Sequence, residues 1–302
     1  MRLVTRSDFD GLACAVLLKL AGVVDEYKFA HPKDLQDGLV EVDENDVLAN
    51  VPYVSGCGIW FDHHSSETER LGAFEFVGAS KLSPSCARVI WEFYGGHKTF
   101  SKELDVMLDA VDKVDSGSLT RDEILNPAGW VLLGMIMDPR TGLGRYRDYR
   151  ISNYQLMMDM IDYCTGKTAD EILEVSDVKE RTDRFFKQHN EFIAMMQRCA
   201  RQDGNVLILD LRDEEEIFTG SRFTVYAMFP ECNVSVQVIW GLKKQNVVLT
   251  VGHSILNRTC KTDIGSLMLK FGGGGHSRVG TCQVLTEDAE SALVEVIATL
   301  KE

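Results

Sequence analysis

Metal-binding side chains gather directly after two short apolar segments in the first 64 residues, and this pattern constrains the fold more than any other. In chain order, the two groups are Asp8 with Asp10, and Asp62 with His63 and His64. Carboxylates suit magnesium and manganese, and imidazole is a common ligand for transition metals. Parallel strands end at the same edge of a sheet, so side chains that follow them come together there. The sequence therefore predicts a sheet with a divalent-metal site at one edge.

Short apolar strands alternate with helices through the first half of the chain. The strands are expected at Leu3–Thr5, Tyr27–Ala30, Asp46–Ala49 and Gly58–Phe61. The helices are expected at Gly11–Ala21, Pro84–Tyr94 and Lys102–Asp112. This alternation predicts a mostly parallel sheet that binds ligands at the carboxyl ends of its strands.

The last third of the chain has a different pattern. Its strands are expected at Val206–Asp210, Val234–Trp240 and Val247–Val251, and its helices near Arg222–Met228, at Asp263–Lys270 and at Ala289–Leu300. We therefore expect an α/β protein with two domains. A mostly parallel-sheet domain covers residues 1–176, a helical connector covers 177–203, and a smaller mixed-sheet domain covers 204–302.

Charge and composition restrict the partners. The formal net charge is −14, from 32 Lys and Arg against 46 Asp and Glu. Proteins that bind long nucleic acids usually present a basic surface, so we expect a small phosphate-containing ligand and no long duplex. The eight cysteines form no C-x-x-C pair, which favours free thiols in a reducing compartment. With no signal-peptide pattern and no apolar run long enough to span a bilayer, we expect a cytoplasmic protein without a membrane partner.

Two further segments are candidate phosphate sites. Four glycines, Gly272 to Gly275, precede His276, and glycine allows a backbone to approach an anion closely. The alternative is that this run only ends a helix. An arginine-rich segment could bind or guide an anion, although a solvated or salt-bridged surface is the plainer interpretation. Its members are Arg140, Arg145, Arg147 and Arg150.

The motifs Asp8-Phe9-Asp10-Gly11 and Asp62-His63-His64, followed by the glycine run, resemble those of DHH-family phosphoesterases, in which a DHH domain precedes a DHH-associated domain. The family includes RecJ-type exonucleases, nano-RNases, cyclic-dinucleotide phosphodiesterases and exopolyphosphatase-like proteins. The resemblance implies an active cleft between the two domains. It also implies hydrolysis of a phosphodiester or phosphoanhydride bond by a metal-activated water. The net charge favours a short oligonucleotide, a cyclic nucleotide or a polyphosphate end as substrate. Manganese or magnesium is the implied cofactor, and the associated domain leaves room for a homodimer.

Carried over motif by motif, the resemblance implies a role for individual residues. The metal-site positions are Asp8, Asp10, Asn50, His63 and Asp115, with Asp112 as the reserve for the last. His64 would contact the substrate or the attacking water. The substrate contacts in the second domain would be Arg258, Gly273, Gly274, Gly275 and His276.

Two of these motifs depart from the family pattern. Arg6 stands where the family has a histidine, and Asn50 stands where it has an aspartate that bridges two metals. Arginine cannot ligate a metal, and asparagine offers one neutral oxygen. We therefore predict one ion rather than two, held at the second metal position, with the Arg6 guanidinium roughly where the first ion would be. There it would stabilise developing charge. His31 is a weaker candidate for a compensating ligand.

Two other classes are open, and the departures motivate the first of them. The chain could be a catalytically degenerate protein that binds or senses nucleotides, because the first metal position has lost ligands. A RecJ-like processive nuclease would need a basic channel, which the acidic composition does not favour.

Overall fold

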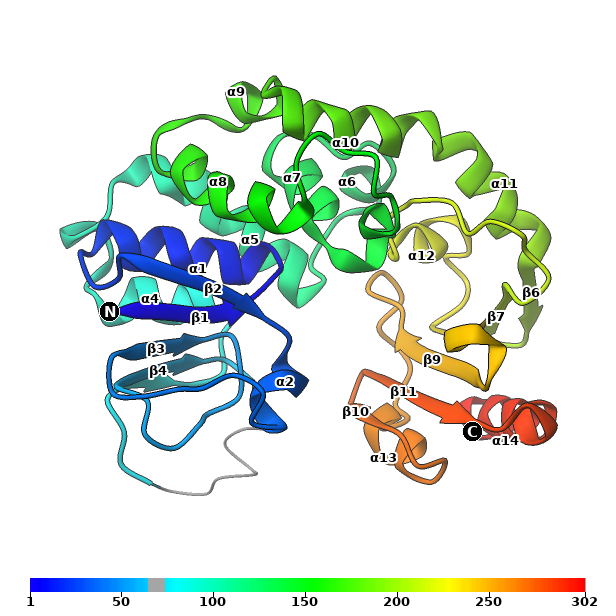
Figure 1. The fold of residues 1–302 in the computed structure, drawn as a ribbon. Coiled ribbons are helices and arrows are strands. Elements are labelled where there is room, and N and C mark those ends of the chain that lie inside the picture. Colours follow the sequence, from blue (N-terminus) through cyan, green and yellow to red (C-terminus); the bar gives the residue numbers. More distant parts are fainter. Residues whose placement is uncertain (65–73, 302) are drawn as a thin grey trace. The chain divides into compact units, whose positions relative to one another are not determined.

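The computed structural model describes residues 1–64 and 74–301, and the chain divides into two compact units (Figure 1). The first unit is Met1–Ser118 with Pro127–Phe185, and the second is Leu119–Asn126 with Phe186–Glu302. The expected α/β class, with one parallel and one mixed sheet, is confirmed. The segment 177–203, expected as a helical connector, contains most of α10 (Ser176–Lys187), all of α11 (His189–Cys199) and the short strand β6 (Ala200–Asp203).

The first unit is built on a five-stranded parallel sheet in the order β2-β1-β3-β4-β5. Its strands are β1 (Arg2–Arg6), β2 (Glu26–Ala30), β3 (Asp46–Ala49), β4 (Ile59–Asp62) and β5 (Gly78–Ser80). The inner strands β1, β3 and β4 are largely buried, as in parallel sheets covered on both faces, whereas β2 and β5 lie at the edges. Strand β5 was not predicted, because Gly-Ala-Ser has no β-branched or aromatic side chain.

Helix α1 (Phe9–Leu20) is the central helix of this unit, because every residue from Phe9 to Leu18 is buried. It packs against α4 (Cys86–Phe93), α5 (Asp105–Ser116), α7 (Gly129–Met137) and α8 (Asn153–Gly166). Shorter helical segments are α2 (Pro32–Gln36), α9 (Ala169–Leu173), η1 (Gly96–Lys98), η2 (Lys102–Leu104), η3 (Pro139–Thr141) and η4 (Leu143–Arg145). The aromatic ring of Trp60, on β4, is buried among apolar side chains on the other side of the sheet.

The second unit has a six-stranded mixed sheet in the order β10-β11-β9-β8-β7-β6. Its strands β7 (Val206–Asp210) and β8 (Val234–Trp240) are parallel, and the other pairs are antiparallel. The remaining elements are β9 (Val247–His253), β10 (Gly274–His276), β11 (Val279–Val284), α6 (Arg121–Leu125), α12 (Thr224–Met228), α13 (Ile264–Leu269), α14 (Ala289–Leu300), η5 (Leu242–Lys244) and η6 (Thr286–Asp288). Buried valines alternate with half-exposed residues along β8 and β9, which places their apolar faces on α13 and α14.

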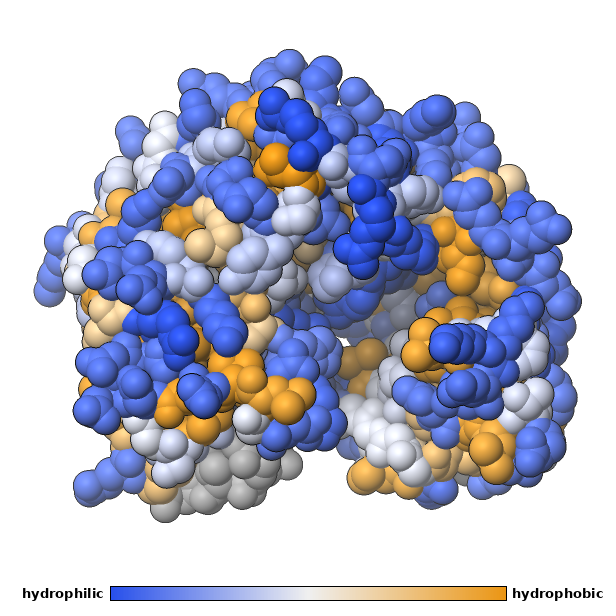
Figure 2. All heavy atoms as spheres, in the orientation of Figure 1, coloured by the Kyte–Doolittle hydropathy of each residue, from blue (hydrophilic) through white to orange (hydrophobic). Residues whose placement is uncertain are grey.

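The surface drawn in Figure 2 is mostly hydrophilic, with small separate apolar patches. Among the described residues, no helix is both long and apolar enough to cross a membrane. All eight cysteines are free thiols, as the absence of paired cysteine motifs predicts.

Candidate active site

The parallel strands of the first unit bring four predicted polar residues to one edge. Arg6 is the last residue of β1, Asn50 follows β3, and Asp62 is the last residue of β4. Asp8 lies between β1 and α1, where its carboxylate accepts a hydrogen bond from the amide of Gly11 at 2.9 Å and caps the helix. Glycine is needed at position 11, because a Cβ there would lie 1.9 Å from the carbonyl oxygen of Arg6.

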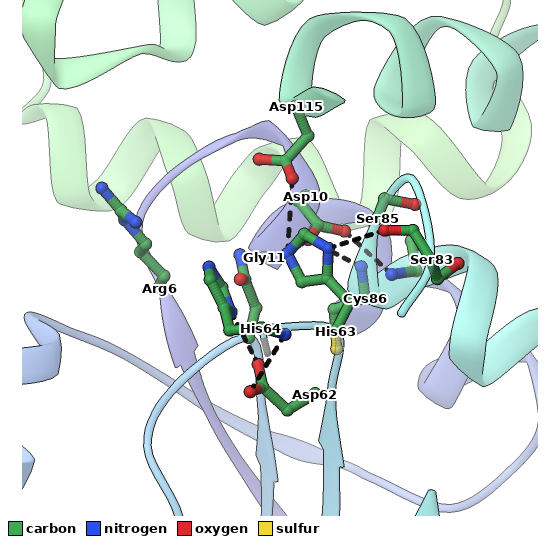
Figure 3. A network of polar contacts seen from close by, with 12 residues as sticks. Arg6, Asp10, Gly11, Asp62, His63, His64, Ser83, Ser85, Cys86 and Asp115 are labelled. Atoms are coloured by element: carbon green, nitrogen blue, oxygen red, sulfur yellow. Dashed lines mark hydrogen bonds and ion pairs between the residues drawn. The ribbon is translucent and has the colours of Figure 1, made fainter. Parts of the chain in front are cut away.

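Asp10, His63 and Asp115 form the group of side chains with metal-binding geometry (Figure 3). One ligand atom from each of the three lies within 4.8 Å of the others. Asp10 is in the first turn of α1, His63 follows β4, and Asp115 is in the last turn of α5. The C-terminal end of a helix carries partial negative charge, so it adds to the attraction that Asp115 exerts on a cation.

The hydrogen bond of His63 leaves one ring nitrogen suited to a metal. Its Nδ1 lies 3.1 Å from the carbonyl oxygen of Ser83, and a carbonyl only accepts, so Nδ1 carries the proton. The other nitrogen, Nε2, then has a lone pair, 3.3 Å from Asp115 Oδ2 and 3.7 Å from Asp10 Oδ2. It is buried and has no hydrogen-bond partner among the residues described. A lone pair that faces two carboxylates is unfavourable unless a cation lies between them, so the residues present fit a divalent metal.

The carboxylate of Asp10 is oriented by the start of α4. Its two oxygens accept hydrogen bonds from the amides of Cys86, at 2.9 Å, and Ala87, at 2.8 Å. Burial and then the nearby charge of Asp115 raise the pKa of Asp10 to about 7. A bound cation would offset both effects and keep the carboxylate ionised.

Asp8 has a different environment from Asp10, because its two oxygens already contact the Gly11 amide, Arg6 and Asn50. Arg6 Nε lies 2.9 Å from Asp8 Oδ2, and the side-chain amide of Asn50 donates to Asp8 Oδ1 at 3.2 Å. Burial raises the pKa of Asp8, and the positive charge of Arg6 opposes this rise. Asn50 is buried with φ of 56°, a left-handed conformation that asparagine tolerates better than most residues.

His64 is hydrogen-bonded to Asp62, and its ring also contacts that of His63, with the centroids 4.3 Å apart. Its Nδ1 lies 2.8 Å from Asp62 Oδ1, and its backbone amide donates to Asp62 Oδ2. Burial opposes a charge on the ring, but the bond to Asp62, together with the negative charges of Asp62, Asp115 and Asp10, outweighs it and raises the pKa of His64. Two other candidates have structural partners: Asp112 accepts from Ser85 and Arg88, and His31 caps α2.

In the second unit, the glycine run forms part of a hairpin. Gly274 to His276 pair with Val279 to Thr281 in antiparallel fashion. Gly273 is required by packing, because a Cβ there would lie 2.2 Å from the carbonyl oxygen of Thr281. Gly275 has φ of 157°, and a Cβ there would lie 2.2 Å from the carbonyl oxygen of Val279. A Cβ at Gly274 would meet open space. The Nε of Arg258 donates to the carbonyl oxygen of Ile255 at 3.0 Å.

Comparison with known proteins identifies the family. The structure matches the pGpG-specific phosphodiesterase PggH from Vibrio cholerae with a TM-score of 0.86 and 49% sequence identity, over 99% of this chain and 98% of that one. The chain belongs to the DHH family of phosphoesterases. The prediction from the sequence that this chain is a phosphoesterase is thereby confirmed. Neither protein-family models nor curated proteins gave a match.

Two more distant structures share the fold of this DHH phosphoesterase. An exopolyphosphatase-related protein from Bacteroides fragilis matches with a TM-score of 0.51 and 14% identity, over 100% of this chain and 93% of that one. RecJ from Thermus thermophilus, in complex with Mn²⁺, matches with a TM-score of 0.52 and 14% identity, over 99% of this chain and 52% of that one.

Sequence reasoning missed the groups that orient the metal-binding side chains of this DHH site. The carbonyl of Ser83 fixes the tautomer of His63, and the amides of Cys86 and Ala87 hold Asp10. These are backbone atoms, for which side-chain identity gives no signal. The serine at position 85, a good N-cap before an apolar run, does mark the start of the helix that provides the two amides.

Proposed function

We propose that this DHH phosphoesterase hydrolyses the linear dinucleotide pGpG, or a closely related 5′-phosphorylated dinucleotide, to mononucleotides. The observation that carries the proposal is the 49% identity with a pGpG-specific phosphodiesterase along nearly the full length of both chains. A short anionic substrate also agrees with the net charge of −14, which opposes binding of long nucleic acids.

The proposed cofactor is one Mn²⁺ or Mg²⁺ ion, held by Asp10, His63 and Asp115. When bound, such an ion lowers the pKa of water and polarises the phosphoryl group, which makes attack by water possible at neutral pH. Ser83 keeps His63 in the tautomer that ligates, and the start of α4 fixes the direction of the Asp10 carboxylate. These contacts prepare the ligands before the ion and the substrate arrive.

Arg6 is proposed to take the place of a second cation. It neutralises Asp8 through Nε, and Asn50 removes the negative charge that a bridging aspartate would add. In this arrangement the site carries one fewer carboxylate and one more fixed positive charge than the family pattern. A guanidinium stabilises charge on phosphate oxygens through N–H donors without needing to be bound from solution.

His64 and the second unit complete the proposed substrate contacts. Asp62 holds Nδ1 of His64, so the ring would act on the substrate or the attacking water through Nε2. The backbone at Gly274, where space is open beside the chain, and the exposed side chain of His276 are proposed to contact the dinucleotide. Arg258, Gly273 and Gly275 are proposed to support the same contact.

The decisive experiment measures hydrolysis with Mn²⁺ and with EDTA: mononucleotide release from pGpG and pApA, linear dinucleotide or mononucleotide from cyclic di-GMP, and phosphate from polyphosphate. We expect Mn²⁺-dependent hydrolysis of pGpG in preference to the cyclic dinucleotide and polyphosphate, and its loss in Asp10→Asn. Asp183→Asn is the matched control, because Asp183 is exposed and no contact of its side chain is seen among the described residues. Preferred turnover of cyclic di-GMP or polyphosphate over pGpG would contradict the proposed substrate.

A further inference from the structure

Arg140 lies at the end of helix α7, which packs against both helices that carry the metal-binding aspartates. Helix α7 contacts α1, which begins beside Asp8 and Asp10, and α5, which carries Asp115. The contact with α1 is close: a Cβ on Gly134 would lie 2.6 Å from the ring of Phe9, the residue between the two aspartates. The chain then turns through Asp138 into η3, where Arg140 is the second residue.

The guanidinium of Arg140 is held from one side only. Asp138 Oδ1 accepts hydrogen bonds from the backbone amide of Arg140, at 2.9 Å, and from its Nε, at 2.7 Å. Within residues 1–64 and 74–301, the two terminal nitrogens of this guanidinium have no hydrogen-bond or ion-pair partner. The side chain remains 46% exposed. Asp138 therefore fixes its direction and leaves an open pair of N–H donors.

The charge of Arg140 also acts on carboxylates of this site. Burial raises the pKa of Asp8, and the positive charges of Arg6 and then Arg140 oppose this rise. Burial lowers the pKa of Arg140, but the negative charges of Asp138, Asp8 and Asp115 outweigh it and raise that pKa. Asp8 thus feels two guanidinium groups that come from different elements, β1 and η3. Of the other arginines of this segment, Arg150 is paired with Asp177, and no side-chain contact of the exposed Arg147 is seen in the described part of the chain.

We propose that Arg140 donates hydrogen bonds to the phosphate that reacts at the Asp10–His63–Asp115 group, and that Asp138 is the residue that positions it. A phosphate entering a site lined by aspartates is repelled unless donors and positive charge face it, and a guanidinium provides both in a planar pair. Arg140 remains protonated throughout, so it contributes charge stabilisation and orientation rather than proton transfer. This inference rests on the proposed hydrolysis of a phosphodiester.

The test compares Arg140→Gln, Arg140→Lys and Asp138→Asn with the control Arg147→Gln, which removes the same charge from the same segment. Each protein is assayed with Mn²⁺ on pGpG and on bis(p-nitrophenyl) phosphate, which has a reactive phosphodiester but neither a 5′-phosphate nor a base. We expect Arg140→Gln to lower kcat by about 10²–10³ on both substrates, the usual loss for one donor to a developing anion. Arg140→Lys should recover part of this loss, Asp138→Asn should lose less, and Arg147→Gln should stay within about twofold of the wild type.

A purely structural role for Arg140 predicts different results. It would change the affinity for Mn²⁺ and the Tm, both of which we expect to be nearly unchanged in Arg140→Lys. If Arg140→Gln keeps its kcat on bis(p-nitrophenyl) phosphate, even while it loses activity on pGpG, the proposed contact with the reacting phosphate is wrong. Failure of the wild type to cleave pGpG while it cleaves bis(p-nitrophenyl) phosphate would contradict the dinucleotide proposal and leave this test intact.

Discussion

Asn50→Asp tests most directly how the absence of a bridging carboxylate at position 50 affects the stability of the site. The side-chain amide of Asn50 donates to Asp8 Oδ1 at 3.2 Å, and both residues are buried. Two carboxylates at that separation repel by about 5 kcal/mol at an effective dielectric constant of about 20. Protonating one of them at pH 7, from an unfolded-state pKa of about 3.9, costs about 4 kcal/mol. Because the folded protein takes the cheaper route, we expect destabilisation of about 4 kcal/mol at pH 7.

The pH dependence of this loss has a definite sign. The new aspartate has a folded-state pKa raised above its unfolded value, so the variant loses stability as the pH rises and recovers it toward pH 4, by about 1.4 kcal/mol per pH unit. The assay is thermal unfolding in EDTA at pH 5 and pH 7, and for a unit of this size about 4 kcal/mol lowers the Tm by about 8–16 °C. Added Mn²⁺ should restore part of the Tm, because a cation between the two carboxylates removes the repulsion.

Asn50→Gly is the matched control. It removes the same hydrogen bond and tolerates the positive φ of 56°, but it adds no charge. The reasoning is refuted if Asn50→Asp is no less stable than Asn50→Gly at pH 7 in EDTA, or if its deficit does not shrink at pH 5.

Four further predictions follow from individual contacts. The wild type should bind one Mn²⁺ per chain by elemental analysis, and His63→Ala should bind it at least tenfold more weakly; two tight ions in the wild type would contradict the one-metal proposal. Combined with Asn50→Asp, Arg6→His should raise the count toward two ions per chain. Asp46→Asn should lower the free energy of unfolding by about 1–3 kcal/mol, since Asp46 is buried and accepts two hydrogen bonds from the Arg2 guanidinium. The pKa of Asp46 is lowered in the folded state, so the difference from wild type should hold above pH 4 and shrink as the pH falls further, by urea titration. Gly275→Ala should lower the Tm, because the new Cβ would lie 2.2 Å from the carbonyl oxygen of Val279, whereas Gly274→Ala should leave the Tm nearly unchanged.

The sequence was sufficient for the parallel sheet and for the edge at which the polar residues meet. Strands β1, β3 and β4 are apolar and short, and each is followed by a residue of the site, so periodicity and order were enough. Strand β5 and the β10–β11 hairpin were missed, because one is a Gly-Ala-Ser tripeptide and the other begins in a glycine run. Their strand conformation comes from pairing with neighbours in the sheet, not from local propensity.

For single side chains, the sequence indicated which residues could bind a metal, but not which residues they contact in the folded protein. It favoured Asp115 over Asp112, and the structure shows that Asp112 is engaged by Ser85 and Arg88 while Asp115 faces His63. That distinction depends on which turn of α5 faces the sheet edge. The hydrogen bond from Asn50 to Asp8 joins residues 42 positions apart, and no spacing rule predicts such a contact.

The two departures from the family pattern are best understood as one change, because both act on the same carboxylate. Asp8 accepts from Arg6 through one oxygen and from Asn50 through the other. An aspartate at position 50 would leave Asp8 facing a second buried negative charge, and a neutral residue at position 6 would leave it without its nearest positive charge. Each substitution therefore makes the other favourable, in the way that a metal ion and its bridging carboxylate stabilise each other. On this argument neither reversal should improve the enzyme by itself, and Arg6→His alone is expected to lower the Tm in thermal unfolding, because it removes the guanidinium that lies 2.9 Å from Asp8 Oδ2.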